Sequence, residues 1–176
     1  CEPGEPFLYF AHTQSDTLDL PHHGSTIEIN RNSMAGYVAL TGEVLNIPDT
    51  YRLPLDVPYK HNTSFDQSVG YRTVSMLCLP MRDTDDQIIG VLQLINKKIH
   101  PDATLRPAER VVEEVIPFAR TDEQLGLALA GQAAVALQNG LLCESIERLF
   151  EGLVRASVQA IEARDPTTSG PVSYTH

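Results

Sequence analysis

The chain has 176 residues, 42% of them apolar, which is enough for one domain whose core buries roughly two-thirds of the surface of the unfolded chain. With 23 acidic and 13 basic residues its formal net charge is -10, which disfavours nucleic acids and anionic membranes as partners. The three cysteines are far apart and form no CxxC motif, which argues against a disulfide framework or a zinc cage and favours a cytoplasmic protein.

The N-terminal part of the chain predicts short strands and one short helix, followed by a long loop. Residues 7–20 have the composition of one or two strands, and residues 25–30 have that of another. A short helix is expected over residues 33–40, and a brief strand over residues 43–47. Residues 48–68 are rich in proline and too long for a simple connector, so we expect them to form a loop that covers a site.

The helix expected over residues 33–40 has suitable residues at both ends. Asn32 or Ser33 is available as the N-cap, and Gly42 is available to end the helix. Main-chain N–H groups at a helix N-terminus attract anions, so this end of the helix is a candidate anion site.

Two apolar runs, residues 74–81 and residues 88–96, flank an acidic turn at residues 83–86. The second run alternates well enough to pair with the first as a β-hairpin. We expect these two strands to lie at the centre of the sheet.

A long helix is expected from Asp122 onward, because helix-forming residues dominate for about 40 residues until a stop signal begins at Asp165. Its most apolar stretch, residues 125–142, is interrupted by polar residues and rich in Ala and Gly. This composition indicates a packed helix rather than a membrane span, and no signal peptide is visible. Four small residues are expected to allow close approach to the sheet: Gly131, Ala133, Ala134 and Ala136.

The second half of this helix carries a repeating apolar pattern. Six residues follow spacings of four, three, four, three and four: Leu142, Ile146, Leu149, Leu153, Ala156 and Ala160. Such spacing is the seam of a short coiled coil, so we expect a parallel homodimer through the C-terminal helix. The alternative is that this face packs onto the domain's own sheet or onto a following domain.

Three segments together carry motifs of one family. The first segment is residues 33–49, the second is residues 70–80, and the third is residues 89–97 followed by Phe118 and an Asp-Glu pair. Over residues 7–143 the chain resembles the GAF family, and specifically its cyclic-nucleotide-binding branch, found in mammalian cyclic-nucleotide phosphodiesterases and cyanobacterial adenylyl cyclases. The resemblance implies an α+β fold with a central antiparallel sheet of about six strands flanked by helices, and a long C-terminal helix. The family's first helix has no counterpart in this sequence.

The resemblance also implies a small-ligand site under the proline-rich loop, with cyclic GMP or cyclic AMP as the ligand and no required cofactor. Matching of segments gives eight candidate residues: Met34 and Ala35 through main-chain amides near the phosphate, Asp66, Val69 and Thr73 from the loop, Gln93 from the sheet floor, and Ala11 and His12 near the base. The alternative is that these residues are ordinary core and loop-capping residues.

The sequence departs from the family pattern at three of these positions. Gln93 stands where binders commonly have an acidic residue, and Ala11 and His12 stand where an aromatic and an acidic residue are common. A different small metabolite or haem is therefore an alternative ligand.

The branch has a signature that this chain matches at five positions: Asn96, Lys97, Phe118, Asp122 and Glu123. The resemblance implies an ion pair between Lys97 and Asp122 that joins the end of a strand to the start of the long helix. A surface pair without a conformational role is the alternative.

The resemblance implies a regulatory domain rather than an enzyme. The histidines show no metal-ligand spacing, and Cys78 lies in an apolar strand where a buried thiol is expected, so we predict no metal and no catalytic residue. Some small GAF proteins reduce methionine sulfoxide, but they need several cysteines around the pocket.

The predicted organisation is a GAF sensory domain at residues 1–143, a connecting helix leading to an output domain at residues 144–170, and a tail at residues 171–176. Residues 153–170 resemble the opening of an HD-GYP domain, the cyclic di-GMP phosphodiesterase type, but its metal ligands lie outside the chain. We therefore expect a sensory module of a bacterial signalling protein that controls a downstream output domain. The alternative is a ligand-free dimerisation module.

Overall fold

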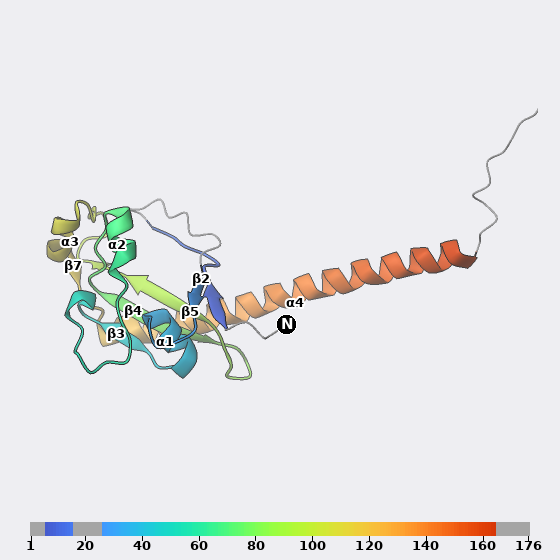
Figure 1. The fold of residues 1–176 in the computed structure, drawn as a ribbon, viewed down its shortest axis with the longest axis horizontal. Coiled ribbons are helices and arrows are strands. Elements are labelled where there is room, and N and C mark those ends of the chain that lie inside the picture. The colour runs from blue at the N-terminus through green and yellow to red at the C-terminus, as the bar shows by residue number, and fades with distance from the viewer. Residues whose placement is uncertain (1–5, 16–25, 165–176) are drawn as a thin grey trace, which may run out of the picture. The chain divides into compact units, whose positions relative to one another are not determined.

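The computed structural model describes residues 6–15 and 26–164 (Figure 1). The chain divides into two compact units, Cys1–Val135 and Ala136–His176. Part of the segment predicted to form one or two strands (residues 16–20), the end of the HD-GYP-like segment (residues 165–170) and the predicted tail (residues 171–176) lie outside the described residues.

The predicted elements appear in the predicted order, but the structure adds two short helices at residues 50–52 and 63–69, where a loop over residues 48–68 was predicted, and a helix and two short strands between residues 97 and 116. The strands are β1 (Phe7–Tyr9), β2 (Thr26–Glu28), β3 (Leu45–Ile47), β4 (Met76–Arg82), β5 (Ile88–Ile95), β6 (Lys97–Lys98) and β7 (Val115–Ile116). The helices are α1 (Met34–Thr41), the 3-10 helix η1 (Thr50–Arg52), α2 (Thr63–Val69), α3 (Ala108–Glu114) and α4 (Arg120–Arg164).

The strands of the described residues form three small antiparallel sheets, of order β1-β2, β3-β4-β5 and β6-β7. The prediction of one sheet of about six strands is therefore wrong in strand count. One reason is Asn96, whose backbone adopts a positive φ of 57° immediately after β5, so that β6 pairs with β7. A second reason is that β1 exposes Phe7 and Tyr9 and buries no apolar face against the larger sheet.

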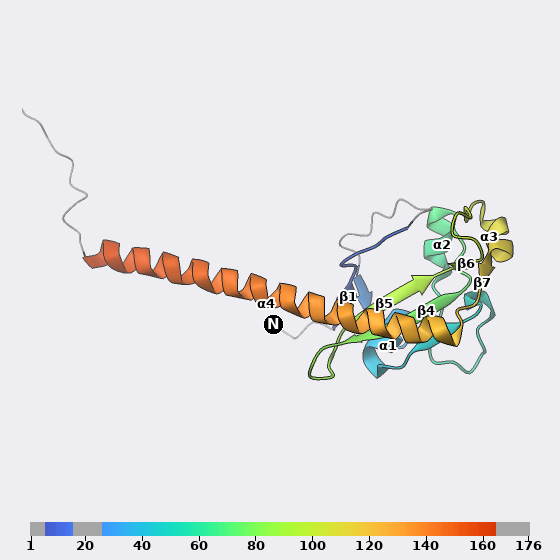
Figure 2. The ribbon, with the colours of Figure 1, turned by 180° about the vertical axis from the view of Figure 1, so that it is seen from behind.

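The sheet β3-β4-β5 lies between α1 on one face and the first part of α4 on the other, as the two opposite views show (Figures 1 and 2). Alternate residues of β4 point to opposite faces. Met76 and Cys78 belong to the core cluster that contains Val38 of α1, and Leu77 and Leu79 belong to the cluster that contains Ala130 of α4. Both faces of β4 are therefore buried, which explains its continuous apolar sequence.

The first part of α4 contacts the sheet through small residues. Gly126, Ala130 and Ala134 are buried at intervals of four residues, and a Cβ on Gly126 would lie 2.5 Å from Leu79 Cδ1. Of the four small residues predicted to face the sheet, only Ala134 is fully buried. The prediction did not identify the correct set of residues. Residues on one face of a helix recur every three or four positions, so the side chains next to Ala134 in the sequence point to other faces of the helix.

The short helix α1 has the predicted caps. Ser33 Oγ accepts a hydrogen bond from Gly36 N at 3.0 Å, and Gly42, with a left-handed φ of 71°, donates its N–H to Val38 O at 2.8 Å. Gly36 packs directly against main-chain carbonyls, because a Cβ there would lie 2.6 Å from Glu28 O and 2.7 Å from Asn30 O.

We expect Gly36→Ala to lower the free energy of unfolding by about 1–3 kcal/mol, because neither carbonyl belongs to a flexible side chain. Gly131→Ala is the matched control, since a Cβ on this helical glycine meets nothing within 4 Å, and it should stabilise the protein by about 1 kcal/mol. Urea unfolding of both variants measures the difference. Equal stability of Gly36→Ala and the wild type would contradict this packing.

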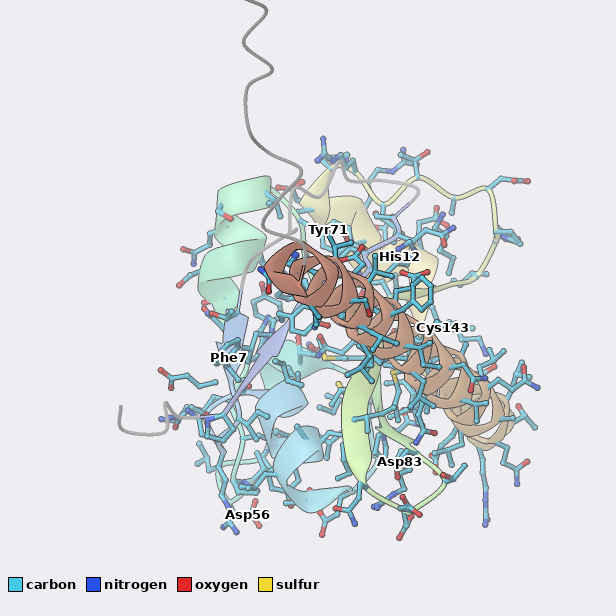
Figure 3. The ribbon with its side chains drawn as sticks, turned by 90° about the vertical axis from the view of Figure 1, so that its right-hand side faces the viewer. Phe7, His12, Asp56, Tyr71, Asp83 and Cys143 are labelled. Carbon is cyan, nitrogen blue, oxygen red and sulfur yellow. The ribbon has the colours of Figure 1, made fainter. Side chains whose placement is uncertain are left out.

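The hairpin of β4 and β5 confirms the predicted acidic turn. Asp83 Oδ1 accepts hydrogen bonds from Asp85 N at 2.9 Å and from Gln87 N at 2.8 Å. Figure 3 shows Asp83 in the loop between the two strands. The carboxylate therefore fixes the turn that brings the two apolar strands together.

The long helix α4 covers the predicted range and continues into the second unit. By length and composition it could cross a membrane, with a mean hydropathy of 1.4 over its best window, a property that core helices of soluble proteins share. In the second unit every described side chain from residue 139 to residue 160 is exposed. Four exposed apolar residues belong to the predicted seam: Leu142, Ile146, Leu149 and Leu153.

Candidate functional site

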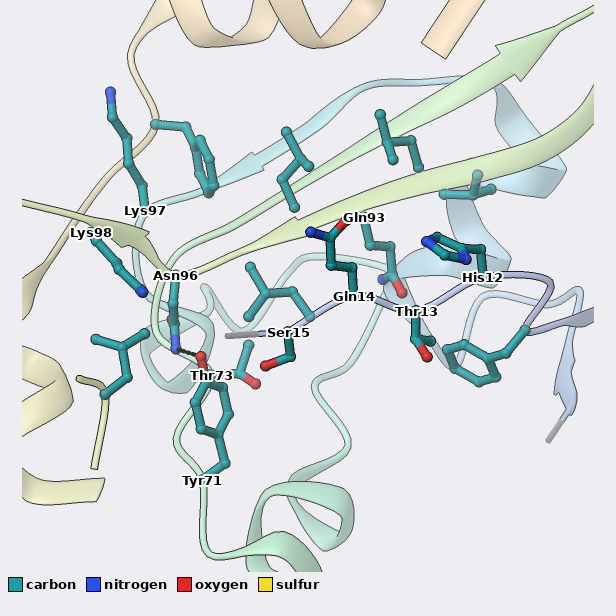
Figure 4. Close-up of a pocket in the computed structure, with 17 residues that line it drawn as sticks. His12, Thr13, Gln14, Ser15, Tyr71, Thr73, Gln93, Asn96, Lys97 and Lys98 are labelled. Atoms are coloured by element: carbon teal, nitrogen blue, oxygen red, sulfur yellow. Dashed lines mark hydrogen bonds between the residues drawn. The ribbon is translucent and has the colours of Figure 1, made fainter. Parts of the chain in front are cut away.

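A cavity of about 680 Å³ lies beside β5 (Figure 4). It is lined by Phe10 and residues 12–15, by Tyr71 and Thr73, by residues 91–98, and by Leu105 and Phe118. Segments that are far apart in the sequence therefore meet at the outer edge of β5.

Three of the eight predicted ligand residues line this cavity: His12, Thr73 and Gln93. Three residues of the family signature line it as well: Asn96, Lys97 and Phe118. The other five predicted ligand residues do not: Met34, Ala35, Asp66, Val69 and Ala11. The structure thus places His12, Thr73 and Gln93 around one cavity, whereas the α1 candidates Met34 and Ala35 do not line it.

The space between α1 and the proline-rich loop is filled by side chains. Met34 is only 4% exposed and packs in the cluster that contains Tyr37, with Leu53 and Tyr59 of the loop against it. The ring centroids of Tyr37 and Tyr59 are 5.2 Å apart. Among the described residues no acceptor bonds to the main-chain N–H of Met34 or Ala35, so these amides keep their hydrogen-bonding capacity.

Gln93 presents an amide to the cavity wall. Its Nε2 lies 3.4 Å from Cys78 Sγ and 3.7 Å from Met76 Sδ. Sulfur atoms are weak acceptors, so the carboxamide retains most of its capacity to donate and accept hydrogen bonds. Burial raises the pKa of the Cys78 thiol to about 12, although the hydrogen bond from Gln93 lowers it, so Cys78 is an unreactive thiol.

Asp66 is buried, accepts several hydrogen bonds and does not line the cavity. Its carboxylate is 2% exposed and accepts hydrogen bonds from Tyr51 Oη at 2.7 Å, from Thr73 N at 2.8 Å and from Thr73 Oγ1 at 2.8 Å. His61 Nε2 lies 3.3 Å from the same carboxylate. Asp66 therefore ties the proline-rich loop and η1 to the segment that enters β4.

The environment of Asp66 favours its charged form. Burial raises the pKa of Asp66, but hydrogen bonds from His61, Thr73 and Tyr51 lower it more, so the pKa lies below the ordinary value of 3.8. Burial and the hydrogen bond to Asp66 raise the pKa of Tyr51 to about 12. Sequence reasoning missed His61 and Tyr51, because no spacing rule relates them to Asp66.

Asn96 shapes one wall of the cavity. It is 4% exposed, and its Oδ1 accepts from Val74 N at 2.7 Å while its Nδ2 donates to Tyr71 Oη at 2.9 Å and to Arg72 O at 2.7 Å. The carboxamide therefore fixes Tyr71 and the start of β4 against the end of β5.

The structure places Lys97 and Asp122 in an ion pair, with side chains 30% and 27% exposed. Asp122 Oδ2 also accepts from Ala119 N at 2.6 Å. The hydrogen bonds from Lys97 and from Ala119 lower the pKa of Asp122. Phe118 O accepts from Asn46 Nδ2 at 3.2 Å, so β3, β6 and the start of α4 are linked by polar contacts.

Metal ligands do not gather in the described part of the chain. Within residues 6–15 and 26–164, no group of three or more His, Cys, Asp or Glu side chains is placed to hold a metal ion. The described side chains that line the cavity offer hydrogen-bonding groups, apolar surface and charge.

Comparison with known proteins relates this geometry to one family. The GAF domain model matches residues 7–137. The chain is 31% identical over 146 residues to the dual 3',5'-cyclic-AMP and -GMP phosphodiesterase 11A of Takifugu rubripes, a match that covers 74% of this chain and 15% of that enzyme. The chain thus spans a small part of the relative. A solved structure that it resembles is the GAF domain from a phosphoenolpyruvate-protein phosphotransferase of Coxiella burnetii, with a TM-score of 0.47, 19% identity, and coverage of 69% of this chain and 58% of that chain.

Proposed function

Because the chain belongs to the GAF domain family, we propose that it is a regulatory domain that binds a cyclic nucleotide, cyclic GMP or cyclic AMP. The phosphodiesterase that it resembles is named for both cyclic nucleotides. The eight residues predicted from the sequence remain the proposed ligand contacts, and His12, Thr73 and Gln93 share one cavity.

The observation that carries this proposal is the cavity beside β5. Its volume of about 680 Å³ lies within the range of about 300–1,000 Å³ typical of small-molecule sites. Apolar side chains such as Val91 and Leu105 offer contact to a flat base, and Gln93 offers both a donor and an acceptor to a base edge. A cyclic nucleotide has a flat base with polar edges, which matches these apolar and polar groups.

We expect Gln93→Leu to weaken binding of the cyclic nucleotide about tenfold, because a polar edge of the base loses its partner in the cavity. Isothermal titration calorimetry with cyclic AMP and cyclic GMP measures the affinity. Gln67→Leu is the matched control, since Gln67 is exposed on α2 and does not line the cavity. Absence of heat at millimolar ligand with the wild type would refute the binding proposal itself.

The second candidate function is that of a ligand-free dimerisation module. The filled space between α1 and the proline-rich loop favours it, because Met34, Leu53 and Tyr59 occupy the place where sequence reasoning put the ligand. This function requires a melting temperature that no nucleotide changes. Titration of the wild type with both cyclic nucleotides in a thermal unfolding assay separates the two functions.

For either function, ligand binding or a ligand-free module, we propose that the chain dimerises through α4. Leu142, Ile146, Leu149 and Leu153 are between 56% and 75% exposed along one face of α4. The ion pair of Glu144 with Arg148 lies off this seam. An apolar seam beside charged flanks supports a parallel coiled coil of two chains.

The proposed output is a downstream domain of the HD-GYP type, with activity toward cyclic di-GMP. It rests on the sequence of residues 153–170, of which the structure describes residues 153–164 as the end of α4. The ion pair of Lys97 with Asp122 connects the cavity wall to the start of α4. Ligand binding would then bias the helix that leads to the output domain.

A further inference from the structure

The cavity runs along the edge of β5 rather than over one face of the sheet. The consecutive residues 91–95 of this strand all line it. Successive side chains of a strand point to opposite faces, so a cavity over one face would be lined only by alternate residues. The main chain of β5 therefore borders the cavity.

The outer edge of β5 is open. β5 is the last strand of the sheet β3-β4-β5, and among the described residues only β4 pairs with it. The main-chain groups of a strand alternate in direction, and Asn96 N, just after β5, donates to Ser75 O on the side of β4 at 2.8 Å. The N–H and C=O groups of Val91, Gln93 and Ile95 therefore point the other way, toward the open edge.

A proline in β4 indicates the same directions. Pro80 lies opposite Val91 and has no N–H, so these two residues cannot exchange a pair of hydrogen bonds. Pairs with and without hydrogen bonds alternate along an antiparallel ladder, so Gln93 and Ile95 also belong to pairs without them. Within residues 6–15 and 26–164, none of these three residues of β5 forms a main-chain hydrogen bond to a segment other than β4.

One step of this open edge lies at the end of the cavity proposed for the base. Figure 4 shows Gln93 together with His12 and Gln14 at one end of the cavity and Tyr71 at the other. His12 is a proposed contact of the base. The step from Val91 to Gln93 is therefore the part of the edge that a base at this end would meet.

The chemistry of this step matches a purine. The carbonyl of one residue and the N–H of the residue two positions further along the strand point the same way, so Val91 O and Gln93 N present an acceptor beside a donor. Adenine carries its 6-amino donor beside the acceptor N1, and guanine carries its N1–H donor beside the acceptor O6. A base in the plane of the sheet can complete both hydrogen bonds, as an added strand would.

We infer that Val91 O and Gln93 N bind the donor and acceptor edge of the purine base. This inference rests on the proposed function and deepens it, because it states which bases the cavity selects: those with a donor and an acceptor side by side. The Gln93 side chain is perpendicular to the row of main-chain groups, so its carboxamide serves a different polar group of the ligand.

Ligands with altered bases test the inference on the wild-type protein. The N6,N6-dimethyl analogue of cyclic AMP lacks the amino donor, and we expect it to bind about tenfold more weakly than cyclic AMP. Cyclic IMP is the matched control. It keeps the N1–H and O6 of cyclic GMP and lacks only the 2-amino group, so its affinity should stay within about twofold of that of cyclic GMP. Isothermal titration calorimetry measures the affinities.

A proline at residue 93 tests the main chain itself. Gln93→Ala removes only the carboxamide, whereas Gln93→Pro also removes the outward N–H, which β4 does not use. Proline is tolerated at such positions of an edge strand. We expect Gln93→Pro to bind cyclic AMP about tenfold more weakly than Gln93→Ala does. Ile95→Pro is the matched control, since it removes the next outward N–H of the same edge and should bind as Ile95→Ala does.

Failure of the inference and failure of the proposed function give different results. If cyclic AMP and its dimethyl analogue bind with equal affinity, or if Gln93→Pro binds as well as Gln93→Ala, the inference is overturned and ligand binding stands. If neither cyclic nucleotide gives heat at millimolar concentration with the wild type, the proposed function fails. Thermal unfolding shows whether the proline variants fold, and if they do not, the altered bases decide.

Discussion

We expect Asp66→Ala to lower the free energy of unfolding by about 3–5 kcal/mol, because it removes a buried charged acceptor and leaves its donors without a partner. The carboxylate is 2% exposed and joins Tyr51 and His61 of the proline-rich loop to Thr73. Urea unfolding at neutral pH measures the loss. Asp56→Ala is the control, since Asp56 is exposed in the same loop, and it should stay within about 0.5 kcal/mol of the wild type.

The contribution of Asp66 should also depend on pH. Its pKa in the folded protein lies below the ordinary value of 3.8, so the unfolded chain takes up a proton at a higher pH than the folded chain does. The stabilisation is therefore complete above the unfolded pKa and is lost as the pH falls through the folded pKa. Unfolding free energies of the wild type and Asp66→Asn should converge below pH 3.8. A difference that stays constant across this range would contradict the charged role.

We expect Leu149→Asp to raise the dissociation constant of the proposed dimer at least a hundredfold, because it places a carboxylate in the centre of an apolar seam. Leu149 is 75% exposed in the single chain, so the substitution leaves the fold of the first unit intact. Sedimentation equilibrium over a range of protein concentrations measures the constant.

The control for the seam lies on the same helix. Val158 is 48% exposed but does not follow the spacing of the seam, so Val158→Asp should leave the dimer unchanged. Leu142→Cys in a Cys143→Ser background should form a disulfide between copies when the helices are parallel and in register, because Leu142 lies at one end of the seam and an antiparallel helix would place the two cysteines far apart. A wild-type chain that stays monomeric at about 100 μM would refute dimerisation through α4.

The parts of the fold that follow from local sequence were predictable. Asp83 fixes the hairpin turn through two main-chain N–H groups, and Ser33 and Gly42 limit α1, because turns and caps depend on residues close in the sequence. The division of the strands into three small sheets was not predictable from the same local patterns. The positive φ of Asn96 turns the chain away from β5, and no periodicity in the sequence indicates it.

The site was predictable only in part. Gln93 and Thr73 lie on or next to predicted strands, and the structure brings them into one cavity. Tyr71 and Lys98 also line the cavity, but they were not among the predicted ligand residues. The partners of Asp66 are set by tertiary contacts that spacing rules do not describe.

The glycine and alanine face of α4 has a mechanical consequence. Gly126, Ala130 and Ala134 meet the strands with no side chain larger than a methyl group, and Leu79 fits into the hollow that Gly126 leaves. An axial slip of the helix would press its neighbouring side chains against Leu79, so this contact restrains α4 along its axis. The ion pair of Lys97 with Asp122 adds a second restraint at the first turn of the helix.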